Sequence, residues 1–124
     1  MQEVKTNKAP AAIGSYSQAV KSGGFVFCSG QIALKADGEL LEGDIREQAA
    51  QVLENLTMVL DEAGSSMSKV VKTTIYLKDM GDFAVVNEIY ASFFTGEIKP
   101  ARATVEVSYL PKRVAIEIDC IAEL

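Results

Sequence analysis

The chain has 124 residues, of which 48% are hydrophobic and 23% are charged, and its formal net charge is −5. This size and balance are typical of one globular domain, residues 1–124, with a sizeable core. The acidic net charge and the scattered lysines and arginines disfavour a nucleic-acid partner. No apolar run approaches the roughly 20 residues of a membrane span, so we expect no membrane association.

The sequence contains no histidine and only two cysteines, Cys28 and Cys120. Histidine is the commonest metal ligand, and two isolated cysteines cannot complete a zinc site. We therefore expect any hydrolysis to need neither a metal nor a cofactor. The two cysteines lie in apolar segments without a C-x-x-C motif, which predicts buried free thiols and a cytoplasmic location. The polar residues 1–5 do not resemble a signal peptide.

Residues 1–12 are expected to form a short lead that is extended or irregular. Within residues 13–30, two apolar-rich runs flank Gly23 and Gly24, a pair that strongly favours a β-hairpin. The second run ends at Gly30, where a glycine permits close approach of the backbone.

A helix is predicted from the cap residue Asp44 to Gly64. Asp44 and Glu47 form an Asp-x-x-Glu variant of the capping box, and glycine commonly ends helices. Apolar residues between them follow helical spacing and predict a stripe that faces the core. The stripe contains Ile45, Ala49, Val52, Leu53, Leu56, Val59, Leu60 and Ala63.

Residues 69–77 are rich in β-branched side chains and predict a strand, followed by a second helix from the cap Asp82 to Gly96. The apolar stripe of this helix includes one amide, Asn87. Such an amide usually bonds to a nearby backbone group, because a buried amide must be satisfied. A site at the edge between helix and sheet is the alternative.

Residues 100–107 and 114–120 alternate with period two, which is typical of strands that bury one face. The linker 108–113 is short enough for a hairpin, and its proline prevents the ladder from continuing. A one-residue slip would bury charges, so we expect the apolar sets of both strands to share one face.

One register of this kind sets Thr104 opposite Glu117 and Arg102 opposite Asp119. A shift by two residues in either direction still leaves Arg102, Thr104 and Glu117 on one face within cross-strand or diagonal reach. A guanidinium, a hydroxyl and carboxylates would then share the surface away from the core. An ordinary solvated sheet face is one interpretation. A site for a carboxylate is the other, because the arginine fork suits bidentate recognition.

The elements follow the order β-β-α-β-α-β-β, which predicts an α+β fold with a mixed sheet and both helices on one face. The opposite face is left without a helix. A sheet face that is partly apolar and partly charged commonly finds a partner.

Four motifs in this order resemble the YjgF/RidA family of reactive-intermediate deaminases, also called the endoribonuclease L-PSP family. They are residues 10–19, Ser29-Gly30-Gln31, Asn87-Glu88-x-Tyr90-x-x-Phe93-Phe94, and Pro100-Ala101-Arg102-x-x-Val105-x-Val107 with Leu110-Pro111 and Ile116-Glu117-Ile118. The resemblance covers nearly the whole chain. It implies a chorismate-mutase-like fold and a homotrimer with sites in the clefts between subunits.

The resemblance also implies metal-free hydrolysis of 2-imino acids, and of their enamine tautomers, to 2-oxo acids and ammonia. Arg102 would hold the substrate carboxylate, and Glu117 would position or deprotonate the attacking water. The other residues implied around the substrate are Tyr16, Ser29, Gly30, Asn87, Ala103 and Thr104. Deaminases of the family often carry cysteine where this chain has Thr104, which leaves the substrate range open.

This chemistry agrees with the residue types present. An imine carbon is already electrophilic, so the reaction needs a carboxylate anchor, a base for water and a proton for the amine. Two other functions stay open. One is a trimeric module that binds 2-oxo acids, or regulates, without turnover. The other is an endoribonuclease or translation inhibitor acting on single-stranded RNA, which the absence of a basic groove and of histidine disfavours.

Overall fold

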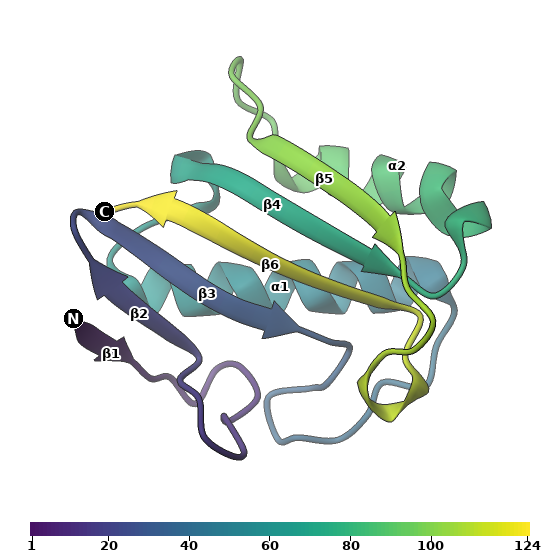
Figure 1. Ribbon diagram of the computed structural model, residues 1–124, viewed down its shortest axis with the longest axis horizontal. Helices are drawn as coiled ribbons and strands as arrows, with labels where there is room; N and C mark the ends of the chain where they lie inside the picture. The colour runs from purple at the N-terminus through teal and green to yellow at the C-terminus, as the bar shows by residue number, and fades with distance from the viewer.

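The computed structural model describes residues 1–124 as a mixed six-stranded sheet with two helices against one of its faces (Figure 1). The order across the sheet is β1-β2-β3-β6-β4-β5. The strands are β1 (Gln2–Val4), β2 (Ala19–Ser22), β3 (Phe25–Gln31), β4 (Val70–Leu77), β5 (Ala101–Glu106) and β6 (Ile116–Glu123), and the helices are α1 (Ile45–Ala63) and α2 (Phe83–Phe93). The predicted fold class is confirmed, and β1 is an additional short strand in the lead that was predicted to be extended or irregular.

Local sequence signals set the ends of α1 as predicted. Asp44 accepts a hydrogen bond from the Glu47 backbone at 2.9 Å, and the Glu47 side chain accepts one from the Asp44 backbone at 3.3 Å. Gly64 ends the helix with a left-handed φ of 84°. At α2 the cap position Asp82 is also correct, although its side chain makes no capping bond, because a 3-10 turn leads directly into the helix.

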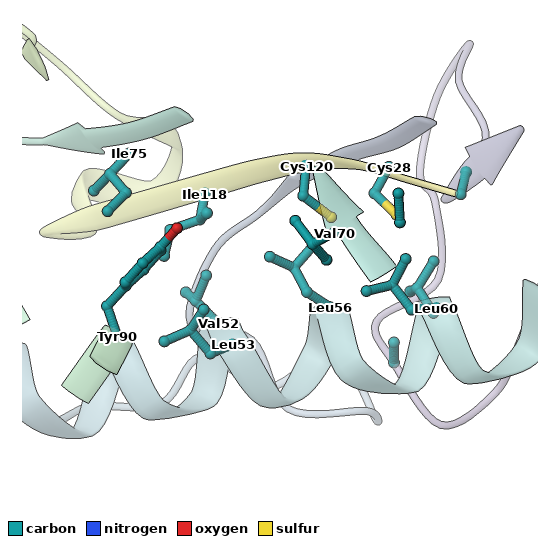
Figure 2. Close-up of a cluster of buried hydrophobic side chains, with 14 of the residues drawn as sticks. Cys28, Val52, Leu53, Leu56, Leu60, Val70, Ile75, Tyr90, Ile118 and Cys120 are labelled. Atoms are coloured by element: carbon teal, nitrogen blue, oxygen red, sulfur yellow. The ribbon is translucent and has the colours of Figure 1, made fainter. Parts of the chain in front are cut away.

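The core fills the space between α1 and the central strands (Figure 2). The predicted stripe on α1 is buried apart from Ile45, which packs only partly against the core. Cys28 on β3 lies directly opposite Cys120 on β6, and both are buried free thiols, as predicted. The pKa of Cys120 is raised above its ordinary value, first by its interaction with the Cys28 thiol and second by burial. The Cys120 thiol therefore stays protonated.

The predicted hairpin between the last two strands is wrong, because β4 lies between them. β5 pairs in parallel with β4 on one side, and β6 pairs antiparallel with β4 on the other. Neighbouring strands are about 4.8 Å apart, so the linker before β6 easily spans two such spacings. Alternation identifies the buried face of a strand, whereas several choices of neighbour satisfy the same alternation.

β5 also faces the opposite way from the prediction. Arg102 pairs with Thr73, which is fully buried beneath α2, so Arg102 lies on the helix-covered side. Ala103 and Val105 therefore point to the helix-free face. Glu117, whose neighbours along β6 are buried under the helices, lies on the helix-free face too. Arg102 and Glu117 are thus on opposite faces of the sheet.

Candidate active site

Glu117 projects from β6 into a cavity of about 590 Å³ on the helix-free face. Three other predicted site residues, Tyr16, Ser29 and Gly30, line the same cavity. They come from the segment before β2 and from the end of β3, which is the immediate neighbour of β6 in the sheet. The structure therefore brings together four of the residues that the sequence motifs single out.

A β-bulge at the end of β3 makes room for the Glu117 carboxylate. The register runs from Cys28 opposite Cys120 to Gln31 opposite Ile118, which leaves one extra residue on β3. Gly30 lies in this bulge. A β-carbon there would overlap Glu117 Oε2 and come within 2.8 Å of its Cδ. The Glu117 carboxylate therefore packs directly against the Gly30 backbone, and a side chain at position 30 would have to displace it.

The wall of this cavity is held by a buried side chain, Gln18, whose role the sequence did not reveal. Its amide bonds to the backbone of Thr6 at 2.7 and 3.1 Å and to the Pro10 carbonyl at 2.7 Å. Ser29 donates its hydroxyl to the Ser17 carbonyl at 2.6 Å. The available signal was the motif of residues 10–19, which contains this glutamine. These bonds fasten the N-terminal segment beside the cavity.

Glu117 is half-buried, and burial is the first cause that raises the pKa of its carboxyl above the ordinary value. The Asp119 carboxylate adds to the rise, and Asp119 is held by a 3.0 Å hydrogen bond from Tyr76 Oη. Glu117 itself forms no ion pair with another residue of the chain. A carboxylate in this state is a stronger base than usual and carries a proton more readily.

Arg102 lies in a second cavity, of about 440 Å³, between the edge strand β5 and α2. Its Nη1 donates to Asn87 Oδ1 at 2.8 Å, so this amide bonds to a side chain and not to the nearby backbone group that such an amide usually meets. Its Cζ lies 4.9 Å from the Tyr90 ring centroid and 5.5 Å from that of Phe83. Cation–π attraction and this hydrogen bond orient the guanidinium and leave its other N–H groups available for a carboxylate.

The Tyr90 ring lies beneath the guanidinium and is held by two neighbours, Thr73 and Phe94. Its hydroxyl shares a 2.8 Å hydrogen bond with the buried Thr73, and its ring centroid is 4.4 Å from that of Phe94. Burial raises the pKa of Tyr90, so the phenol stays neutral. The sequence motif on α2 includes Tyr90 without revealing that this ring supports Arg102.

The two remaining predicted residues, Ala103 and Thr104, follow Arg102 on β5. Thr104 lies on the helix-covered side, and its hydroxyl is buried without a hydrogen-bond partner in the chain. Ala103 points to the opposite face. Neither residue lines the Glu117 cavity. The predicted site is therefore divided into two parts, one around Glu117 and one around Arg102, on opposite faces of the sheet.

The fold is therefore α+β, with a half-buried carboxyl on the helix-free face and an oriented guanidinium between β5 and α2. No group of three or more histidine, cysteine, aspartate or glutamate side chains is placed to hold a metal ion. Neither helix has the length and apolar character needed to cross a membrane.

Comparison with known proteins identifies the family. The model for endoribonuclease L-PSP matches residues 6–124, and the chain belongs to this family, which is the YjgF/RidA family. A RutC family protein of Pyrococcus abyssi is 55% identical over 94% of this chain and 92% of its own length. The rat 2-iminobutanoate/2-iminopropanoate deaminase is 48% identical over 96% of this chain and 87% of its own. A Rid family structure from Yersinia pestis has a TM-score of 0.97 and 48% identity, covering 99% and 98% of the two chains.

Replacing Gly30 tests the contact with Glu117. Gly30→Ala should destabilise the protein by about 1–3 kcal/mol, because the new methyl group overlaps the Glu117 carboxylate. In a Glu117→Ala background the same substitution should cost much less, so chemical denaturation of the four proteins should give a coupling energy of at least about 0.5 kcal/mol. Gly96→Ala is the control, since the nearest atom to its β-carbon would be 3.7 Å away. Additive effects of Gly30→Ala and Glu117→Ala would contradict the contact.

The raised pKa of Glu117 predicts a pH-dependent stability. At low pH the carboxyl is protonated in both the folded and the unfolded chain. As the pH rises, the unfolded chain loses this proton first, so stability falls between the unfolded and the folded pKa and stays lower at neutral pH. Glu117→Gln should therefore raise the Tm at pH 7, with a gain that vanishes near about pH 3.5. A gain of equal size at both pH values would point to packing instead of charge.

Proposed function

We propose that this protein hydrolyses reactive 2-imino acids to 2-oxo acids and ammonia without a metal, as a 2-iminobutanoate/2-iminopropanoate deaminase. The observation that carries the proposal is the Glu117 carboxylate, which lies against Gly30 in an open cavity with a raised pKa and no ion pair. The similarity to the rat protein of that name supports the same chemistry.

In the proposed reaction Glu117 acts first as a base and then as an acid. It takes a proton from water while the water oxygen adds to the carbon of the protonated imine, which gives a neutral tetrahedral carbinolamine. Glu117 then returns this proton to the nitrogen, and the carbon–nitrogen bond breaks as the C=O bond forms. The hydroxyl proton passes to the departing ammonia, which leaves as ammonium. A raised carboxyl pKa suits both steps, because general acid–base catalysis is most efficient when the pKa approaches the working pH.

Arg102 is proposed to bind the carboxylate of the 2-imino acid. Asn87 occupies Nη1, and the aromatic rings beneath the guanidinium restrict its rotation. The planar fork that remains suits a carboxylate in the bidentate manner. Because the group is oriented before the substrate arrives, less side-chain freedom is lost on binding.

A second copy of the chain is proposed to complete the site, because one chain keeps Arg102 and Glu117 on opposite faces of the sheet. The edge strand β5 leaves Val105 41% exposed, and Phe27 on the helix-free face is 42% exposed. β5 of one copy against the Glu117 cavity of the next would cover such apolar groups and bring the two halves together. A contact between two different surfaces closes into a ring, and the family resemblance implies a ring of three.

Binding of 2-oxo acids without turnover is the second candidate, since the oriented Arg102 fork is sufficient for it. A coupled assay in which a dehydratase generates the imine separates the two functions. Accelerated loss of the imine supports the deaminase, whereas binding of 2-oxobutanoate with no acceleration supports the binding module.

Single substitutions should separate the two roles. Glu117→Gln should lower the deaminase rate by roughly 10²–10⁴ and leave the affinity for 2-oxobutanoate almost unchanged. Arg102→Ala should weaken that affinity by at least about a hundredfold, because two charge-assisted hydrogen bonds are lost. Arg102→Lys should recover only part of the loss. Glu123→Gln, also on β6 but outside the cavity, is the control. Near-normal turnover in Glu117→Gln would remove Glu117 from the mechanism.

Mixed oligomers test whether each site draws on two copies. Glu117→Gln and Arg102→Ala chains should each be inactive alone. Co-expressed in equal amounts in a ring, they should restore about one quarter of the wild-type activity, because one cleft in four combines an intact Glu117 with an intact Arg102. Mass spectrometry of the intact oligomer should confirm mixing. Mixed rings no more active than the separate variants would place the whole site within one chain.

A further inference from the structure

Lys112 is the only cationic side chain that lines the Glu117 cavity. It lies in the 3-10 turn Pro111–Arg113, within the connection between β5 and β6. Its ammonium forms neither an ion pair nor a hydrogen bond with the rest of the chain. The positive charge is therefore free to meet a group that enters the cavity from outside.

The backbone holds Lys112 in a conformation that is unfavourable for a residue with a side chain. Lys112 and Arg113 are consecutive left-handed residues, with φ of 55° and 58°. They are the only residues other than glycine with positive φ in the chain. The turn is fixed by a 3.0 Å bond from Arg113 N–H to the carbonyl of Leu110, which is buried. Left-handed residues cost stability, and strain of this kind gathers at functional sites.

Lys112 does not neutralise Glu117. A close ammonium would lower the pKa of a carboxyl, whereas burial and Asp119 raise the pKa of Glu117. The ammonium thus lies in the same cavity as the reacting carboxylate but apart from it. The cavity volume of about 590 Å³ equals roughly 20 waters, which leaves room beyond a four-carbon imino acid.

We propose that Lys112 is a specificity residue that binds a second anionic group, so that the cleft favours 2-imino dicarboxylic acids over monocarboxylic ones. This inference rests on the proposed function, in which Arg102 takes the carboxylate next to the imine. A second carboxylate at the far end of a short chain would then meet the Lys112 ammonium. Arg113 shares the charge, exposure and backbone conformation of Lys112 but does not line the cavity.

The test compares 2-oxoglutarate with 2-oxopentanoate, which has the same number of carbons but ends in a methyl group. Titration calorimetry measures both affinities without turnover. The wild-type protein should prefer 2-oxoglutarate by roughly three- to tenfold, the effect expected of one partly solvated ion pair. Lys112→Gln should abolish this preference and change the affinity for 2-oxopentanoate by less than about twofold. Arg113→Gln, with the same change of charge, should keep the preference.

Three results would overturn the proposal. They are a wild-type protein without the preference, an equal loss in Lys112→Gln and Arg113→Gln, and an equal weakening of both ligands by Lys112→Gln. The last result would make Lys112 a general carboxylate anchor. Hydrolysis of 2-iminobutanoate by the wild-type protein is measured separately. A protein that does not hydrolyse 2-iminobutanoate but keeps the Lys112-dependent preference for 2-oxoglutarate would refute the deaminase function and keep this proposal. A protein that hydrolyses 2-iminobutanoate but lacks the preference would refute only this proposal.

Discussion

Strand β4 determines how the candidate site is divided. It pairs antiparallel with β6 and in parallel with β5, and its alternate residues Thr73, Ile75 and Leu77 are fully buried under the helices. This burial fixes the register of both neighbours, since a slip by one residue would turn every side chain over. Arg102 is thereby directed toward α2 and Glu117 toward the helix-free face. The core, more than any local motif, thus separates Arg102 from Glu117.

The site contains several features that lower stability. Glu117 is a half-buried carboxyl with a raised pKa, Thr104 has a buried hydroxyl without a partner, and Lys112 is a strained left-handed residue. Each costs free energy in the folded state. The apolar contact between α1 and the sheet stabilises the folded chain and so offsets this cost (Figure 2). Groups left without partners in one chain are also the groups most ready to meet a ligand or a second copy.

Local signals predicted the elements well, because caps and periodicity act over a few residues. The capping box at Asp44, the turn at Gly23 and Gly24 and the stripe on α1 all appear in the structure. The neighbour of β5 was mispredicted, because alternation leaves pairing open and a short linker crosses one strand as easily as it forms a hairpin. Four residues of the sequence motifs, Tyr16, Ser29, Gly30 and Glu117, line one cavity in the structure. The motifs did not reveal the contacts of Gln18, Tyr90 and Lys112, which only the folded chain brings about.

The apolar residues of β5 point to the face opposite to the predicted one, and this difference has a physical reason. Ala103 and Val105 alternate as residues of a buried face do, yet in this chain they point away from its core. Alternation records that a face is buried, and the burying surface need not belong to the same chain. The same strand carries Arg102, one of the two side chains that a single copy cannot bring together. The apolar outer face of this edge strand and the Arg102 that it carries are the observations behind the proposed contact with another copy. In that contact, hydrophobic burial and assembly of the site would be one event.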